Sequence, residues 1–423
     1  MGSIIVEKSA LQGELEISGA KNSALPILAA VLLTDEEVIL HKIPVLSDVE
    51  TMIDILRTAG KNVVFEKETG TVRVSGGILH THVPYELVRK MRASFNVLGP
   101  IAVIMGESST PLPGGCAIGV RPVDFHIEGL KKLGFDVNYD HGEILAKRGN
   151  KPEEVAVYLP FPSVGATEHI MSVAAVLPGV TVIENAAMEP EIVDLQDLLN
   201  EMGANISGAG TSKIMITGVK KLHGCEYTVI PDRIEAGTYV LAILTTGGEG
   251  LIKNVRTDHL DALWAVLEKT GAIVKKGENS VEVKSWNNWR GCDIDVMPYP
   301  GFPTDLQPQA IVYLSLAQGT SMITENVFKT RFAHVGELVR MGANIKIKEN
   351  TVIINGVERL QGTTVMGTDL RATAALVIAG FAAEGETEVT QAEYIFRGYE
   401  NVIEKFAKLG GKIRYVPGGV PEI

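Results

Sequence analysis

The chain has 423 residues, of which 45% are hydrophobic and 21% are charged, so it can build a large core, most simply in two domains, and is not a disordered chain. Its formal net charge of −12 argues against a general nucleic-acid or anionic-membrane surface. The 3 cysteines show no short-range pairing, so neither a disulfide framework nor a zinc site is expected.

The N-terminus and the apolar runs predict neither export nor membrane insertion. Met1–Lys8 lacks the basic-then-apolar pattern of a signal peptide. No apolar run is long enough to cross a bilayer without charges or loop signals. We therefore expect a soluble protein of a reducing compartment, the cytoplasm, with no membrane partner.

An amphipathic helix that ends in glycine and runs into a short strand occurs six times along the chain. The intervals between these glycines, by subtraction, are 68 to 74 residues, and the positions are Gly60, Gly134, Gly203, Gly271, Gly342 and Gly410. Glycine is typical of a helix C-terminus because it enters the left-handed region at little cost. A hairpin-like pair of strands follows each glycine, as in Asn344–Ile347 and Thr351–Ile354. The chain is therefore read as six copies of one unit.

Each repeat also holds a second, far more apolar helix. The first is predicted over Ala24–Leu33, and the others start near Ser94, Thr167, Gly237, Gln309 and Ala372. A helix that is hydrophobic all round must be buried on every side. The most economical packing puts three such helices at the centre of each of two domains, with sheets and amphipathic helices around them. The predicted fold class is α/β, with helices inside.

Cations stand at the starts of several inner helices, at Lys21, Arg92, Arg233 and Arg371. A cation there opposes the positive end of the helix dipole, which suggests an anion bound at the helix N-terminus. A solvated surface role explains any single one equally well, but four of the six repeats share the pattern. Three loop arginines add to the count: Arg121, Arg331 and Arg397. We interpret the set as a basic cleft between the domains for a multiply anionic small molecule.

The segment Pro111–Asp124 is rich in glycine and proline and contains Cys116, a composition that predicts a loop. A loop thiol beside Arg121 can reach solvent and feels a positive charge, and both favour the reactive thiolate. Cys225 and Cys292 lack such a setting and are interpreted as structural. Together with a carboxylate at a helix start, Asp305, the basic cleft and Cys116 permit acid–base catalysis on a phosphorylated substrate.

No motif points to a cofactor or a metal. The sequence has no Walker loop, no Gly-x-Gly-x-x-Gly opening a dinucleotide helix, and no His/Cys cluster with metal-ligand spacing. His126, His169 and His334 fall in ordinary helical patterns and are interpreted as structural or surface residues. A nucleic-acid enzyme is also disfavoured, since only 6% of residues are aromatic and available for base stacking.

Seven motifs, in order over essentially the whole chain, resemble the enolpyruvyl transferases, and in particular those that act on UDP-N-acetylglucosamine. They are GAKNSA at 19–24, the Cys116 loop with RPVDFH at 121–126, SVGAT at 163–167, PDRIE at 231–235, PTDLQ at 303–307, DLR at 369–371 and RGYE at 397–400. The resemblance implies two inside-out α/β barrels of three repeats each. The N-terminal domain would be residues 21–228, and the C-terminal domain residues 1–20 and 229–423.

The resemblance implies transfer of the enolpyruvyl group of phosphoenolpyruvate to the 3'-hydroxyl of UDP-N-acetylglucosamine with release of phosphate. This reaction begins peptidoglycan precursor synthesis for the cell wall and is the target of fosfomycin. Asp305 matches the base that takes the hydroxyl proton, and Cys116 matches the proton donor. The implied catalytic residues are Cys116, Asp305, Lys21 and Arg397, with no metal and no cofactor.

The substrate contacts implied by the resemblance fall into two sets. Phosphoenolpyruvate would bind Lys21, Asn22, Arg121, Arg331, Arg371 and Arg397. UDP-N-acetylglucosamine would contact Arg92, Arg121, Pro122, Val123, Asp124, Phe125, Ser163, Val164, Gly165, Asp305 and Val327. This chain departs from the family pattern at Phe161, where some members carry a lysine that contacts the diphosphate. The lysine contact is therefore not carried over to this chain.

Two other functions stay open. A sister enolpyruvyl transferase acting on shikimate 3-phosphate has the same fold and reaction type, but the Cys116 loop and the Ser163–Gly165 motif speak against it. A non-catalytic relative could sense UDP-N-acetylglucosamine and regulate a partner. The presence together of Lys21, Cys116, Asp305 and Arg397 speaks against that alternative.

Overall fold

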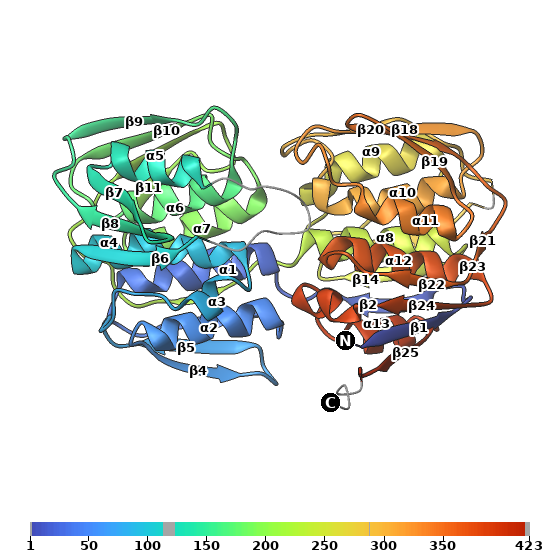
Figure 1. Ribbon diagram of the computed structural model, residues 1–423, viewed down its shortest axis with the longest axis horizontal. Helices are drawn as coiled ribbons and strands as arrows, with labels where there is room; N and C mark the ends of the chain where they lie inside the picture. The colour runs from blue at the N-terminus through green and yellow to red at the C-terminus, as the bar shows by residue number, and fades with distance from the viewer. Residues whose placement is uncertain (1, 113–122, 287, 419–423) are drawn as a thin grey trace. The chain divides into compact units, whose positions relative to one another are not determined.

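The computed structural model describes residues 2–112, 123–286 and 288–418 (Figure 1). They divide into two compact units. The N-terminal unit runs from Gly19 to Ile230, and the C-terminal unit combines the residues up to Ser18 with those from Pro231 onward. The domain boundaries predicted at 20/21 and 228/229 each lie two residues from these divisions. Within the described ranges, no helix has the length and apolar character needed to cross a membrane.

The described residues of the N-terminal unit form three sheets. Their strand orders are β13-β3-β5-β4 (Glu226–Thr228, Val38–His41, Thr71–Ser75, Asn62–Glu66), β6-β8-β7 (Glu107–Pro111, Glu143–Arg148, Phe135–Asp140) and β11-β12-β10-β9 (Asn205–Ser207, Lys213–Thr217, Val180–Glu184, Glu154–Tyr158). The helices are α1 (Lys21–Ala30), η1 (Val31–Leu33), α2 (Ser47–Thr58), α3 (Tyr85–Val88), η2 (Arg92–Val97), α4 (Leu98–Met105), α5 (Asp124–Lys132), α6 (Val164–Ala174) and α7 (Pro190–Glu201).

The C-terminal unit repeats this plan. Its larger sheets are β15-β16-β14-β2 (Ile273–Lys276, Ser280–Lys284, Glu249–Lys253, Gln12–Glu16), β17-β18-β20-β19 (Ile294–Val296, Thr320–Glu325, Thr351–Asn355, Asn344–Lys348) and β22-β24-β1-β25 (Thr364–Met366, Glu386–Thr390, Ser3–Glu7, Lys412–Val416). A short pair joins β21 (Leu360–Gln361) to β23 (Ala383–Glu384). The helices are α8 (Arg233–Thr245), η3 (Thr257–Leu260), α9 (Asp261–Thr270), η4 (Thr304–Leu306), α10 (Gln307–Ser315), α11 (Ala333–Arg340), α12 (Leu370–Ala382), η5 (Ala392–Arg397) and α13 (Val402–Lys408).

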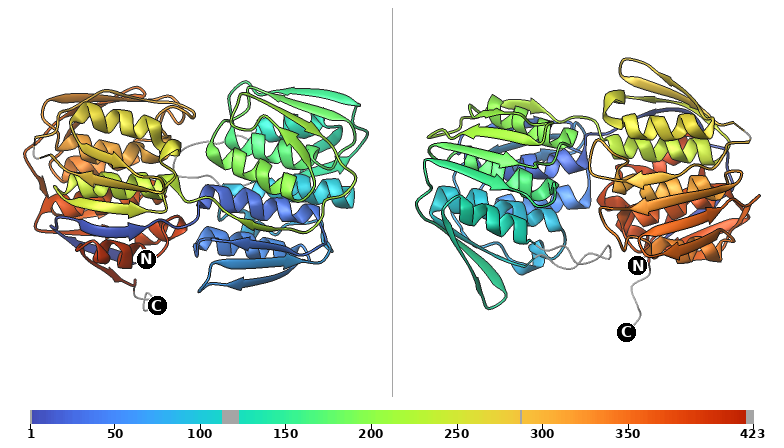
Figure 2. Two further views of the ribbon diagram at one scale, coloured as in Figure 1. Left: turned by 180° about the vertical axis from the view of Figure 1, so that it is seen from behind. Right: turned by 90° about the horizontal axis from the view of Figure 1, so that it is seen from above.

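The apolar helices lie at the centre of each unit, and the sheets lie outside them (Figures 1 and 2). Every residue of α8 and α10 is buried, and α10 packs against both α8 and α12. In the other unit, α6 packs against α1 and α4. The α/β prediction with central helices is confirmed, because helices without a polar face are buried on all sides. The closed-barrel detail stays a prediction.

The six predicted helix-ending glycines confirm the repeat. All of them have positive φ, between 83° and 110°, the region that glycine enters at little cost. The predicted pairs β11–β12 and β19–β20 are antiparallel. Helix α8 begins at Arg233, four residues before the predicted start near Gly237, because the Asp232 side chain caps it by accepting from the N–H groups of Ile234 and Glu235 at 2.8 and 2.9 Å.

The sequence left three histidines as either structural or surface residues, and their burial favours the structural alternative. His126, His169 and His334 are all buried. They lie on helices α5, α6 and α11, and each occupies a position that faces the core. A helical pattern identifies the buried face but does not show that a polar residue on it has partners.

The central helices should dominate the stability of each unit. Ile311 on α10 is fully buried, whereas Ile347 on β19 is 51% exposed. Ile311→Ala is expected to lower the free energy of unfolding by about 2–5 kcal/mol, since it removes buried methyl groups and leaves a cavity. The matched control Ile347→Ala should lower it by less than about 1 kcal/mol. Urea unfolding measures both, and equal losses would contradict the central position of α10.

Candidate active site

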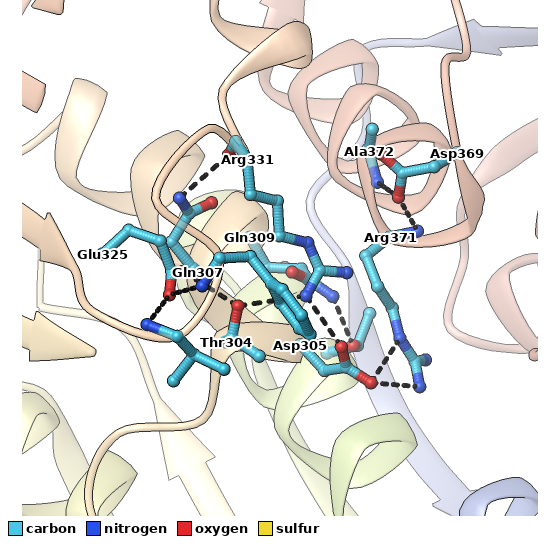
Figure 3. Close-up of polar contacts among 12 residues, drawn as sticks. Thr304, Asp305, Gln307, Gln309, Glu325, Arg331, Asp369, Arg371 and Ala372 are labelled. Carbon is cyan, nitrogen blue, oxygen red and sulfur yellow. Dashed lines mark hydrogen bonds and ion pairs between the residues drawn. The ribbon is translucent and has the colours of Figure 1, made fainter. Parts of the chain in front are cut away.

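Asp305, Arg331 and Arg371 meet in the C-terminal unit (Figure 3). Asp305 lies in η4, directly before α10, while Arg331 follows β18 and Arg371 is the second residue of α12. Arg331 Nη1 donates to Asp305 Oδ1 at 2.8 Å, and Arg371 donates to Oδ2 through Nη2 at 3.1 Å and Nε at 3.3 Å. The structure therefore brings together three predicted site residues from separate parts of the chain.

The two arginines are almost completely buried, whereas Asp305 is not. The side chains of Arg331 and Arg371 are 3% and 2% exposed, and that of Asp305 is 26% exposed. Buried cations of this kind need a paired anion. Among the described residues, Arg331 Nε and Arg371 Nη1 have no hydrogen-bond partner. The cluster therefore presents a partly exposed carboxylate that is held by two buried cations.

Arg371 is fixed from two sides. Asp369 caps α12 and accepts from the N–H groups of Arg371 and Ala372 at 2.9 and 3.1 Å. The Arg371 guanidinium lies 5.2 Å from the centroid of the Tyr399 ring, a cation–π geometry. Burial opposes its charge, but Tyr399 and Asp305 more than offset that effect, so the pKa of Arg371 is raised. Arg371 is therefore a fixed, permanently charged group.

Glu325, which the sequence did not single out, organises the other side of the cluster. Its carboxylate accepts from Thr304 Oγ1 at 2.8 Å and from the N–H groups of Val327 and Phe328 at 2.8 and 2.9 Å. Burial raises the pKa of Glu325. Thr304 Oγ1 in turn accepts from Arg331 Nη1 at 3.1 Å. Glu325 thus fixes predicted contact residue Val327 relative to Arg331.

In the N-terminal unit, Lys21 forms an ion pair within the protein. This pair corrects the inference that a cation at a helix start indicates a bound anion. Lys21 opens α1, and its ammonium lies 2.8 Å from Asp48 Oδ2 on α2, with both side chains buried. The cation at this helix start is thus offset inside the protein and does not by itself require a bound anion. No sequence signal marked Asp48, because acidic residues are common in the first turn of a helix.

Asp194 joins the start of α1 to the end of the unit. It accepts hydrogen bonds from Ser23 Oγ, from the Tyr227 hydroxyl at 2.6 Å and from the N–H of Ile230 at 3.4 Å. Burial raises the pKa of Asp194 from 3.8 to about 6. The turn after Lys21 is therefore tied to a segment some two hundred residues later in the chain.

This raised pKa predicts a pH dependence of stability. Between pH 4 and 6, folded Asp194 keeps its proton while the unfolded residue has lost it, so the free energy of unfolding falls as pH rises through this window. Between pH 4 and 7 the free energy of unfolding of the wild type should fall by about 3 kcal/mol at most, relative to that of Asp194→Asn. Urea unfolding of both proteins at each pH measures the difference. A difference that stays constant with pH would refute the prediction.

The described residues predicted to contact the nucleotide sugar lie mainly at helix starts. Asp124 and Phe125 open α5, directly after the buried Val123, and Arg92 opens η2. Ser163 caps α6 by accepting from the N–H of Ala166 at 3.4 Å, and Val164 and Gly165 form its first turn. Residue 161, the departure from the family pattern, is half-buried.

The remaining predicted residues are placed as follows. Asn22 is the second residue of α1, and Arg397 ends η5; both are half-buried. Cys116, Arg121 and Pro122 lie outside the described residues. Burial raises the pKa of both Cys225 and Cys292 to about 11, so these two thiols are held in the unreactive, protonated form.

Comparisons with known proteins cover the whole chain. The family model of EPSP synthase (3-phosphoshikimate 1-carboxyvinyltransferase) matches residues 5–406. UDP-N-acetylglucosamine 1-carboxyvinyltransferase of Fervidobacterium nodosum is 76% identical over 100% of both chains. The protein of the same name from Thermotoga maritima is 59% identical over 98% of this chain and 99% of its own.

Two solved structures share the fold. The enolpyruvyl transferase NikO from Streptomyces tendae superposes with a TM-score of 0.90 at 22% identity, over 99% of each chain. EPSP synthase from Acinetobacter baumannii superposes with a TM-score of 0.76 at 16% identity, over 99% of this chain and 100% of its own. At such identities these similarities bear on the fold alone.

Proposed function

The chain belongs to the EPSP synthase family of enolpyruvyl transferases, and we propose that it transfers the enolpyruvyl group of phosphoenolpyruvate to the 3'-hydroxyl of UDP-N-acetylglucosamine, releasing phosphate. The observation that carries this assignment is the 76% identity, over both full lengths, to a relative named for that reaction. The family model and the shared folds do not choose between acceptor substrates. The product would enter peptidoglycan precursor synthesis, in the cytoplasm.

Asp305 is proposed as the base. It is the most exposed member of its cluster, and its carboxylate can take the proton of the 3'-hydroxyl as that oxygen bonds to C2 of phosphoenolpyruvate. C2 accepts the oxygen only as C3 gains a proton, which the family resemblance assigns to Cys116. Loss of a C3 proton and departure of phosphate from C2 then give the enolpyruvyl ether.

Arg331 and Arg371 would control the basicity of Asp305. As they stand, both guanidinium groups stabilise the charged carboxylate and make it a weak base. A phosphate or carboxylate of phosphoenolpyruvate bound beside Asp305 would share the positive charge of the two guanidinium groups. Asp305 would then become more basic only when phosphoenolpyruvate is bound. The same cations offset negative charge that develops in the transition state.

Residues of the N-terminal unit are proposed to complete the substrate contacts. Lys21, paired with Asp48, and Asn22 would bind phosphoenolpyruvate, together with Arg121 and with Arg397 of the C-terminal unit. The nucleotide sugar would lie at the starts of η2, α5 and α6. A single cleft shared by residues of both units stays a prediction.

Release of phosphate from phosphoenolpyruvate tests the proposal. We expect release that requires UDP-N-acetylglucosamine, is blocked by fosfomycin and falls in Cys116→Ser. Phosphate release that instead requires shikimate 3-phosphate would favour the sister activity. The names of the similar relatives already speak against that activity. Tight nucleotide-sugar binding without turnover of either acceptor would favour the sensor.

A further inference from the structure

Two buried histidines form a pair between helices α5 and α6, whose starts carry predicted nucleotide-sugar contacts. His126 is the third residue of α5, and His169 is the sixth residue of α6. Their Nδ1 atoms lie 3.1 Å apart, and the two residues are 3% and 1% exposed. None of the roles proposed above uses either residue.

The surroundings fix where the protons of this pair lie. The N–H of Gly99, in the first turn of α4, donates to His169 Nε2 at 2.8 Å. A backbone N–H can only donate, so Nε2 must accept, and His169 is neutral with its proton on Nδ1. That proton faces His126 Nδ1, which must accept in turn. His126 is therefore also neutral, with its proton on Nε2. In agreement, burial lowers the pKa of both residues, to about 3 for His169.

The pair also sets the spacing of the helices around it. A Cβ on Gly165 would lie 3.2 Å from His126 Cε1 and 3.3 Å from its Nε2. A Cβ on Gly99 would lie 2.3 Å from His169 Nε2. The Phe95 ring meets both imidazoles edge-on, with centroids 5.3 and 5.9 Å away. The imidazoles thus fill the space between η2, α4, α5 and α6 with no room for an added methyl group.

Three of these segments carry predicted contacts to the nucleotide sugar: η2 with Arg92, α5 with Asp124 and Phe125, and α6 with Ser163–Gly165. The Nε2 edge of His126 lies against Gly165, in the first turn of α6. An apolar pair could fill the same volume, but it would fix neither the ring orientation nor the hydrogen-bond direction.

We propose that His169 is a positioning residue for nucleotide-sugar binding. It acts through His126, whose ring and tautomer it fixes, and so holds the starts of α5 and α6 at the separation that the ligand requires. This inference rests on the proposed function, because it takes those helix starts as the nucleotide-sugar site.

Two substitutions separate hydrogen bonding from packing. His169→Leu removes both the acceptor for Gly99 and the donor to His126, whereas His169→Gln can supply both through its amide. We expect His169→Leu to raise KM for UDP-N-acetylglucosamine about fivefold to tenfold, with KM for phosphoenolpyruvate within about twofold of wild type, and His169→Gln to recover most of the loss. Met171→Leu, at a buried neighbour on α6, is the packing control and should leave both KM values unchanged.

Long-range proton–nitrogen NMR of wild-type enzyme with 15N-labelled histidine tests the tautomers without using activity or a variant. At pH 7 we expect a proton on Nδ1 of His169 and on Nε2 of His126. An imidazolium at either position, the opposite tautomers, equal rises in both KM values, or a His169→Gln variant no better than His169→Leu would overturn the inference. Wild-type enzyme that turns over neither acceptor would instead refute the proposed function, and the positioning role with it.

Discussion

Asp305→Asn is expected to lower kcat by about 10²–10⁴-fold, the range typical of a lost general base. The amide has the shape of the carboxylate and can still accept from Arg331, but it cannot take a proton from the acceptor hydroxyl. It also removes the anion that competes for Arg331 and Arg371. KM for phosphoenolpyruvate should therefore stay the same or fall. Steady-state phosphate release measures both constants.

The control for this substitution is Asp295→Asn, which changes an exposed aspartate on β17 of the same unit. It should leave kcat and both KM values unchanged. Removal of the Asp305 charge leaves two buried cations without their anion, so Asp305→Asn should also lower thermal stability, and inorganic phosphate should restore part of it. Near-normal kcat in Asp305→Asn would exclude Asp305 as the base.

Arg371→Leu is expected to lower kcat/KM for phosphoenolpyruvate by about 10²–10³-fold, the loss typical of a removed electrostatic contact at a reacting anion. The guanidinium holds Asp305 Oδ2 through two nitrogens and stacks on Tyr399. Arg371→Lys keeps the charge but loses the planar guanidinium, which donates two hydrogen bonds to Asp305 and stacks on Tyr399. It should therefore recover only part of the activity.

The matched control is Arg340→Leu, at an exposed arginine on α11, which should not affect kcat/KM. Arg371 is buried, so unfolding must be ruled out by circular dichroism of each variant. A folded Arg371→Leu variant that keeps its KM for phosphoenolpyruvate would remove Arg371 from the substrate site.

The repeats and central helices could be predicted because they leave local signals. A glycine after an amphipathic helix and a helix with no polar face are both visible in a short window of sequence. Asp305, Arg331 and Arg371 were found as residue types at helix starts and in loops, and through the family resemblance. Their mutual contacts could not be predicted, because Asp305 and Arg371 are 66 residues apart.

The partners that hold the site were missed for the same reason. Asp48, Asp194 and Glu325 have no unusual neighbours in the sequence, and their roles arise only when distant elements pack together. Ser23 and Asp194, for example, are 171 residues apart. His126 and His169 occupy buried helical positions that a pattern cannot distinguish from apolar ones, so their hydrogen bond required the structure.

The sheet order of the C-terminal unit has a consequence for synthesis of the chain on the ribosome. Strand β1, among the first residues made, lies between β24 and β25, which are among the last. The N-terminal unit is complete once residue 230 has emerged, whereas β1 waits for its partners until nearly the whole chain has been translated. Nascent chains stalled at the point where residue 230 has just left the ribosome should therefore contain a protease-resistant N-terminal unit, with β1 and β2 still open to cleavage.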